Sequence, residues 1–159
     1  MLRPARLAAI AACAAGFVAL SAVPAAAGTA TLSIAGCTLT APSTGTPPAP
    51  VTVSAAGSRI TSCSISGASR VSGGLTANST LTTQADGSIT ADVVRLSVTA
   101  TIVILPVTCG YRATGVNLPL ASAGPPTWSY SGNASAARES GSSACPATFS
   151  GAATASITP

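Results

Sequence analysis

The sequence contains no histidine, and its seven basic residues are all arginine, so lysine is absent as well. Without histidine there is no Ser-His-Asp triad and no Cys-His nucleophile pair, and zinc would lack imidazole ligands. Without lysine there is no Ser-Lys dyad and no Schiff base. The G-x-S-x-G elbow, the P-loop and the dinucleotide fingerprint are also missing. These absences predict a protein that is not an enzyme and that has no cofactor and no metal site.

Charged residues are scarce, at 6% of the chain. Nucleic-acid binding needs Lys and Arg clustered on one face, and the arginines here are spread along the sequence, so we expect no nucleic-acid partner. The only carboxylates close in sequence are Asp86 and Asp92, which a glycosidase could use as a pair. Asp86 precedes Gly87, however, and aspartate is favoured in such turns for backbone reasons. We interpret Asp86 as a turn residue.

The N-terminus reads as an export signal. Two arginines are followed by an uncharged apolar run and then by an A-x-A site that ends at Ala27. These are the three parts of a secretory signal peptide. We predict a signal helix over residues 1–27 that is cleaved between Ala27 and Gly28, which leaves a single secreted β-rich domain over residues 28–159. No later apolar stretch is long enough to span a membrane.

Four cysteines follow the predicted cleavage site: Cys37, Cys63, Cys109 and Cys145. An even count in an exported chain predicts two disulfides, and four cysteines allow three connectivities. We prefer the nearest-neighbour pairing, Cys37–Cys63 and Cys109–Cys145. Each bridge would contribute roughly 3–4 kcal/mol by restricting the unfolded chain.

Cys37 has an alternative interpretation, because the stretch SIAGC at residues 33–37 matches a lipobox. In that case the protein would be lipid-anchored through Cys37 to the outer face of the cytoplasmic membrane, and the Pro-rich segment 41–50 would be a tether. Polar residues separate SIAGC from the apolar run, however, and acylation would leave one of the other cysteines unpaired. We therefore expect a disulfide at Cys37 and a loop at residues 41–50.

The mature chain reads as many short strands separated by Gly and Pro. Residues 86–87 and 73–74 predict hairpin turns, Gly36 predicts a bulge within a strand, and residues 134–139 are compatible with one helical turn. The continuous apolar run TIVIL at residues 101–105 predicts a central buried strand. Together these signals predict an all-β fold, a small antiparallel β-sandwich or barrel-like domain.

The aromatic residues suggest the one candidate binding site. Trp128 and Tyr130 fall on one face of a predicted strand, and Tyr111 is a third candidate. On an exposed sheet face such rings could stack on sugar, which makes a carbohydrate- or glycan-binding module the alternative function. The interpretation that we favour is that these rings fill the core, since large aromatic side chains are usually buried.

Four stretches carry a resemblance: ITSCSISG, TIVILPVTC, LPLASAGPPTWSYSG and CPATFSG. With these stretches and its Ala-, Thr-, Ser- and Gly-rich composition, the mature chain resembles a group of uncharacterised exported proteins of actinobacteria. The resemblance implies secretion and a β-rich, disulfide-bonded fold, with no assigned activity and no functional residue. We expect a non-enzymatic protein with a structural or interaction role at the cell envelope or outside the cell. The sequence does not distinguish between two kinds of partner, a cell-wall glycan and another envelope protein.

Overall fold

The structure is a computed structural model that describes residues 27–65, 67–102 and 104–159. The predicted signal helix lies outside these residues, except for Ala27. The described part of the chain contains eleven β-strands and no helix. The strands are β1 (Ala27–Ile34), β2 (Cys37–Thr44), β3 (Val51–Val53), β4 (Arg59–Cys63), β5 (Ala68–Leu75), β6 (Ser79–Thr83), β7 (Ile89–Ile102), β8 (Leu105–Leu118), β9 (Leu120–Ser122), β10 (Trp128–Gly141) and β11 (Thr148–Thr158).

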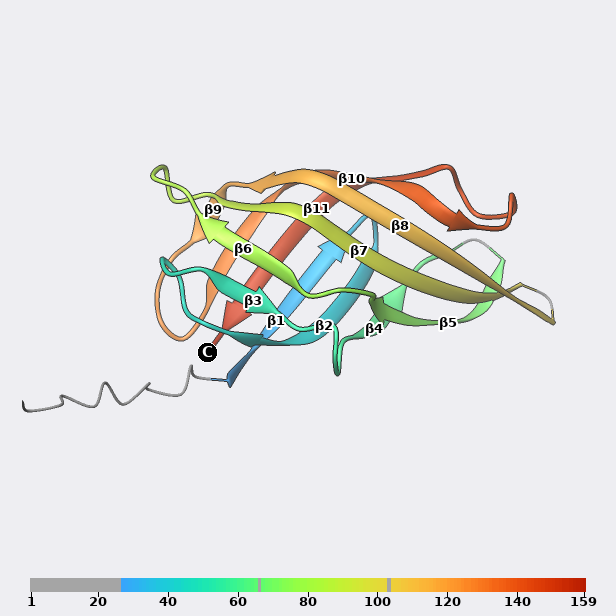
Figure 1. The fold of residues 1–159 in the computed structure, drawn as a ribbon, viewed down its shortest axis with the longest axis horizontal. Helices are drawn as coiled ribbons and strands as arrows, with labels where there is room; N and C mark the ends of the chain where they lie inside the picture. The colour runs from blue at the N-terminus through green and yellow to red at the C-terminus, as the bar shows by residue number, and fades with distance from the viewer. Residues whose placement is uncertain (1–26, 66, 103) are drawn as a thin grey trace, which may run out of the picture.

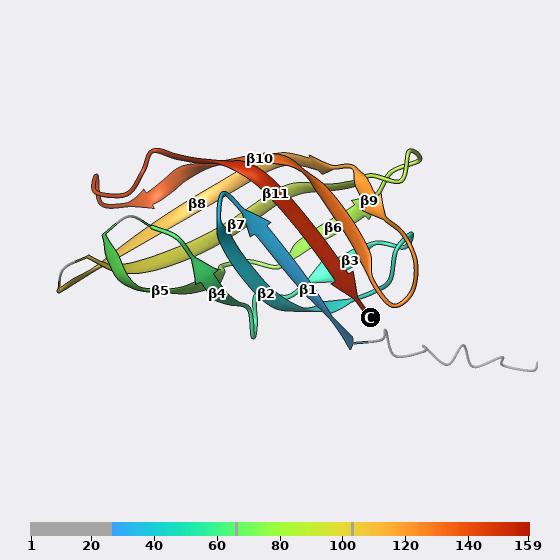
Figure 2. The same ribbon diagram turned by 180° about the vertical axis from the view of Figure 1, so that it is seen from behind.

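The strands form one antiparallel sheet that closes on itself. Neighbouring strands follow the order β1-β11-β10-β8-β7-β6-β3-β2, and β2 pairs in turn with β1. The ring can be followed in Figures 1 and 2. Of the two architectures predicted, this closed pairing is the barrel. A ring of eight strands encloses an interior just wide enough for side chains to fill or for one small ligand.

The two ends of the barrel are built from different short strands. At one end β3 and β6 complete the ring, with Val51 paired to Leu81. At the other end β4 extends from β2 and β5 extends from β7. No ladder pairing joins β4 to β5 in the part of the chain that the structure describes. Instead, the N–H of Leu75, at the end of β5, donates a hydrogen bond at 2.8 Å to the Oγ of Ser58, which precedes β4. We call these the β3–β6 end and the β4–β5 end.

The period of two in the sequence decides which side chains enter the barrel. Along β11, Ala153, Ala155 and Ile157 are buried, whereas the alternate residues Ala152 and Thr154 are exposed. Successive side chains of a strand point to opposite faces of the sheet, so the apolar set lines the interior and the Ser- and Thr-rich set meets the solvent. Threonine suits this outer face because β-branched residues are favoured in strands.

Two turns show how well local sequence predicts hairpins. The turn predicted at residues 86–87 joins β6 to β7, as expected. The bulge predicted at Gly36 is instead a two-residue hairpin turn between β1 and β2, with positive φ at both Ala35 (47°) and Gly36 (83°). Tight hairpins of this kind need positive φ at both central residues, and glycine supplies it most easily. The phase change seen in the sequence therefore marks a reversal of the chain.

Three further local predictions differ from the structure. Residues 73–74 lie within β5 and not in a turn: a Cβ at Gly73 would collide with the Ser97 carbonyl oxygen of β7, so glycine permits a close approach of two strands. Residues 134–139 belong to β10, held there by ladders to β8 and β11. The Pro-rich loop begins only after Thr44, because β2 continues through Pro42, whose carbonyl accepts a hydrogen bond from the Ser54 N–H.

The apolar run at residues 101–105 is not a buried central strand. Ile102 pairs with Leu105, so the run turns back on itself at the tip of the β7–β8 hairpin. The side chains of Ile104 and Leu105 are 81% and 68% exposed. These residues lie beyond the rim of the barrel, where the β7–β8 hairpin extends past the ring of strands. The pattern of apolar residues in the sequence does not show how far two paired strands extend in this way.

The structure confirms the predicted disulfide pairing, Cys37–Cys63 and Cys109–Cys145. The first bridge joins residues that face each other on β2 and β4. The second ties β8 to the segment between β10 and β11. Both bridges reinforce the β4–β5 end, and two disulfides are consistent with an extracellular or otherwise oxidising compartment.

No helix within the described residues is long and apolar enough to cross a membrane.

Candidate ligand cavity

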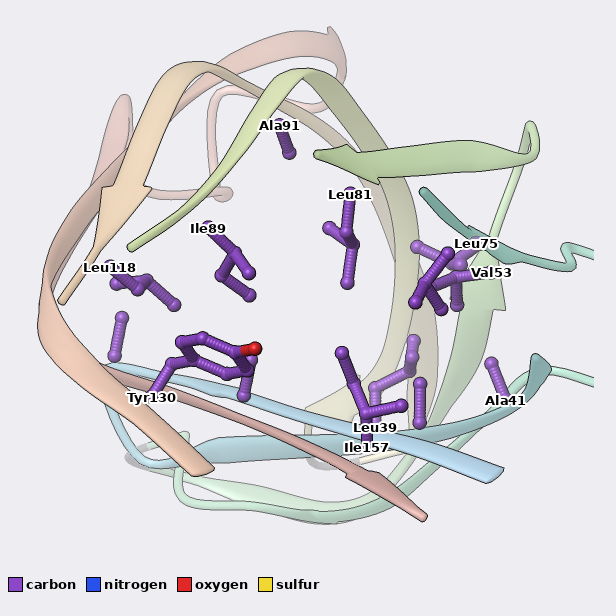
Figure 3. Packing of buried hydrophobic residues seen from close by; sticks show 14 residues of the cluster. Leu39, Ala41, Val53, Leu75, Leu81, Ile89, Ala91, Leu118, Tyr130 and Ile157 are labelled. Carbon is purple, nitrogen blue, oxygen red and sulfur yellow. The ribbon is translucent and has the colours of Figure 1, made fainter. Parts of the chain in front are cut away.

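The interior of the barrel contains a cavity of ≈ 140 Å³. Its walls are almost entirely apolar and come from strands all around the ring. Figure 3 shows Leu81, Ile89 and Leu118 pointing inward across the enclosed space from Leu39 and Ile157. The lining residues that carry a hydroxyl are Ser33, Thr38, Thr90, Tyr111 and Thr154, of which Thr154 is exposed on the outer face of β11. A cavity of about 150 Å³ with such walls stays free of water and accepts small apolar molecules.

Alanine accounts for much of this space. Several inward-facing positions that line the cavity carry only a methyl group: Ala91, Ala100, Ala113, Ala134, Ala153 and Ala155. A filled barrel interior is normally packed to the density of an organic crystal by larger aliphatic side chains. Much of the hydrophobic content of this sequence is alanine. These alanines make the wall of the barrel apolar, but their side chains are too small to fill the space inside it.

The cavity is long and narrow. On β8, lining residues recur from Val107 to Leu118. At the usual rise along a strand these residues span roughly 35 Å. With the usual tilt of barrel strands this corresponds to about 25–30 Å along the barrel axis. A volume of ≈ 140 Å³ spread over such a length leaves a slot and not a rounded chamber.

One end of the slot is closed. At the β3–β6 end, Tyr130, Ile157, Val51 and Val53 are each 2% exposed or less and belong to the same core cluster, and none of them lines the slot. At the β4–β5 end the lining residues Ile65, Ile102, Val107 and Phe149 are only partly buried, and Pro146 is exposed. The cavity therefore has its mouth at the β4–β5 end.

The rim of this mouth is held in place by Arg138. Its Nη1 donates hydrogen bonds to the Ser142 carbonyl oxygen at 2.9 Å and to the Cys145 carbonyl oxygen at 2.6 Å. Cys145 is in turn bonded to Cys109 on β8. Two residues of the same segment, Ala144 and Pro146, line the cavity, so the arginine and the disulfide together fix one lip of the mouth.

The aromatic candidates belong to the interior. Tyr130 is 2% and Tyr111 is 5% exposed, and Trp128 is partly buried against the core. The Tyr111 ring lies 6.0 Å from that of Phe149, with 41° between the ring planes. Burial raises the pKa of the Tyr111 and Tyr130 hydroxyls, opposed in part by the charge of Arg138 and by a hydrogen bond with Thr83, respectively. Neither tyrosine presents a free ring face on the outer surface.

The carboxylates and the predicted cleavage site lie apart from the cavity. Asp86 is an exposed turn residue whose Oδ1 accepts hydrogen bonds from the Ser88 N–H at 2.9 Å and from its Oγ at 2.7 Å. These bonds lower the pKa of the Asp86 carboxyl. Asp92 is exposed on the outer face of β7. Ala27 and Gly28 are the first two residues of β1.

No protein-family model, curated protein or solved structure matches this chain. A function for the protein is therefore inferred from the geometry and chemistry of its cavity.

Proposed function

We propose that the protein is an exported, non-enzymatic binding protein that holds an apolar ligand, a single hydrocarbon chain, inside the barrel. The observation that carries this proposal is the closed barrel with an apolar interior slot, lined by alanine where larger side chains would fill it. An interaction role was expected from the sequence, and the cavity supplies a ligand class for it.

The shape and chemistry of the slot favour a slender ligand. Burial of an unpaired polar or charged group among such walls would be costly, so a polar head group would stay at the mouth. Each methylene taken from water into the slot would contribute roughly 0.8 kcal/mol. A volume of ≈ 140 Å³ holds a segment of one chain, and bulky ring systems would not fit along the axis.

The composition of the walls supports a non-enzymatic role. The three cysteines that line the cavity, Cys37, Cys109 and Cys145, are all in disulfides. Among the lining residues of the described structure, the serine and threonine hydroxyls have no histidine, lysine or carboxylate beside them in the lining to act as a general base, and Tyr111 is the one residue whose side chain has an ordinary pKa of about 10. General acid–base or nucleophilic catalysis needs such groups in contact with the ligand.

The glycan-binding alternative receives less support. Stacking on sugar requires ring faces that are open to solvent, whereas Tyr111 and Tyr130 are buried. Trp128, the remaining candidate, is partly buried and packs against the same core.

The barrel also supports free secretion over a lipid anchor. Acylation at Cys37 would require removal of the preceding residues, which include the whole of β1. β1 pairs with both β2 and β11, so its loss would open the barrel and expose the slot. The intact mass of the protein from its native host tests this point. We expect a chain that starts near Gly28 and whose four cysteines are alkylated only after reduction; a chain that starts at Cys37 with added acyl mass would contradict it.

Two neighbouring alanines on β11 test the binding proposal. Ala153 is buried and lines the slot, whereas Ala152 is exposed on the outer face. We expect Ala153→Leu to weaken binding of a linear polyene fatty acid, measured by fluorescence titration, about tenfold or more, because the larger side chain occupies the slot. Ala152→Leu should bind like the unmodified protein.

The two variants are compared by near-UV circular dichroism and thermal unfolding to establish that both are folded. No binding by the unmodified protein, or equal binding by two folded variants, would contradict the proposal. Native mass spectrometry of protein from its host would add the identity of any ligand that it carries.

A further inference from the structure

The tip of the β7–β8 hairpin exposes two large aliphatic side chains at the mouth of the barrel. Ile104 and Leu105 are 81% and 68% exposed, in a chain whose outer face is otherwise rich in Ser and Thr. Figures 1 and 2 show this hairpin extending farther than any other element at the β4–β5 end. The two side chains therefore meet whatever approaches the mouth before the rest of the barrel does.

The apolar surface of the tip is continuous with the wall of the cavity. Leu105 pairs with Ile102, and Ile102 lines the cavity together with Val107, two residues beyond Leu105 on β8. An apolar path thus leads from the exposed tip into the slot without an intervening charged residue on this hairpin. A hydrocarbon chain could follow this path with little exposure to water.

The charge around the mouth is positive. Arg70 on β5 is exposed and pairs with Thr101, one residue before Ile102, and Arg138 lies on the rim. Two of the three carboxylates of the described residues lie far from the mouth: Asp86 is in the turn between β6 and β7, and Asp92 is near the start of β7. The third, Glu139, is next to Arg138 in β10 and forms an ion pair with Arg95 at 3.3 Å.

The dimensions of the tip fit a lipid surface better than a protein partner. A specific protein interface buries about 800 Å² on each side, usually as a broad patch with an apolar centre. Here two aliphatic residues stand at the end of a narrow hairpin flanked by polar strands. Such a tip can enter the boundary between head groups and acyl chains, about 5–10 Å deep, while an exposed arginine behind it meets anionic head groups.

We infer that the Ile104–Leu105 tip and Arg70 dock the barrel, mouth first, on an anionic lipid surface. Docking in this orientation brings the acyl chains of the surface to the open end of the slot. The transfer of a chain between lipid surface and slot rests on the proposed function, whereas docking itself does not.

Co-sedimentation with lipid vesicles tests the docking. The full mature chain is mixed with vesicles of phosphatidylcholine alone or with phosphatidylglycerol added. We expect binding to the anionic vesicles, lowered about tenfold or more in Ile104→Ser/Leu105→Ser because two aliphatic side chains no longer leave water. Arg70→Ser should lower it by about fivefold and make it less sensitive to salt.

The matched control is Leu120→Ser. Leu120 is 39% exposed, but it lies on β9 at the β3–β6 end. This variant should bind vesicles like the unmodified chain. Absence of binding to anionic vesicles, equal binding by the tip variant, or equal loss in the Leu120 variant would each overturn the docking proposal. So would concentration-dependent self-association that is lost in the tip variant while vesicle binding is unchanged, because the tip would then serve a second copy of the chain.

The two proposals can fail separately. Titration of the polyene fatty acid without vesicles measures the slot alone, and the tip variant should keep its affinity there. In a stopped-flow transfer of the same fatty acid from anionic vesicles, the tip variant should be slower. Ala153→Leu should show the reverse pattern: intact vesicle binding with weakened uptake of the fatty acid.

Discussion

Ser43 and Ser79 are both buried serines, 2% and 3% exposed, but only Ser79 has a hydrogen-bond partner for its hydroxyl. The Ser79 Oγ donates to the Val93 carbonyl oxygen at 3.1 Å. The Ser43 Oγ is buried with no partner among the described residues. A buried hydroxyl without a hydrogen bond destabilises the folded state, whereas a hydrogen-bonded one stabilises it.

The two serines therefore predict opposite effects of the same substitution. Ser43→Ala should raise the free energy of unfolding by about 1 kcal/mol, because an unpaired polar group is removed from the interior. Ser79→Ala should lower it by about 1 kcal/mol through loss of the bond to Val93. Urea unfolding followed by circular dichroism measures both. Destabilisation of similar size in both variants would show that the Ser43 hydroxyl has a partner.

The Cys109–Cys145 bridge predicts a coupling between stability and the cavity mouth. Its loop spans 36 residues, so Cys109→Ala/Cys145→Ala should lower the free energy of unfolding by about 3–4 kcal/mol. The same variant should also release bound fatty acid faster, because the lip that carries Ala144 and Pro146 loses its anchor.

Cys37→Ala/Cys63→Ala, whose loop spans 26 residues, is the comparison. It should lose a similar amount of stability while the lip stays anchored. Equal release rates in the two double variants, measured by displacement of the fluorescent fatty acid, would show that the lip does not control exit.

The absence of histidine and lysine makes the pH dependence of stability unusually simple. Burial raises the pKa of Tyr111 and Tyr130, so the folded state holds these protons at a pH where the unfolded chain releases them. Their contribution is fully present below the ordinary tyrosine pKa of about 10 and is lost as the pH rises through the raised values. We expect a nearly flat melting temperature from about pH 6 to about pH 9 and a steep fall above about pH 10.

Tyr111→Phe/Tyr130→Phe provides the check. In this variant the fall in melting temperature above about pH 10 should be much smaller, measured by thermal unfolding at each pH against the unmodified protein. A fall of unchanged steepness would assign the alkaline transition to other groups.

Asp86 predicts the corresponding behaviour in acid. Its hydrogen bonds with Ser88 lower the pKa of the carboxyl, so its contribution to stability is present above the ordinary pKa of about 4 and is lost as the pH falls through the lowered value. Asp86→Asn keeps an acceptor in the turn but cannot titrate. The melting temperature of this variant should therefore vary less with pH in the acid range, and an identical acid profile would show that the turn is not linked to folding.

Local sequence signals predicted the fold class well. Alternation along the strands, the hairpin at residues 86–87 and the even number of cysteines gave an antiparallel all-β domain with both disulfides correctly paired. The strands and the hairpin depend on residues that are near one another in the chain, and the number of disulfides follows from the even cysteine count. The pairing itself was a preference for nearest neighbours among three connectivities, and the structure agrees with it. Gly36 and residues 73–74 were misread because a glycine in a strand region serves a tight turn and a close strand contact equally well.

The cavity could not be predicted in the same way. Which residues face inward follows from the period of two, but the enclosure of a space depends on β1 pairing with β2 and β11 around a ring. The sequence held one relevant signal, alanine at alternate positions such as Ala153 and Ala155. The exposure of Ile104 and Leu105 was hidden for a related reason: an apolar run looks alike inside a barrel and beyond its rim.

The pairing of β1 with β11 has a consequence for how the chain is made. β1 pairs on one edge with its sequence neighbour β2, but its other edge is paired only when β11 is available, with Thr29 opposite Thr158. Contacts between residues so distant in sequence form slowly, because the chain must lose the entropy of closing a long loop before the contacts stabilise it. A chain that emerges N-terminus first would stay open until its C-terminal strand has been released. For the export that we propose for this protein, such a delay would keep the chain unfolded during its passage through a translocation channel.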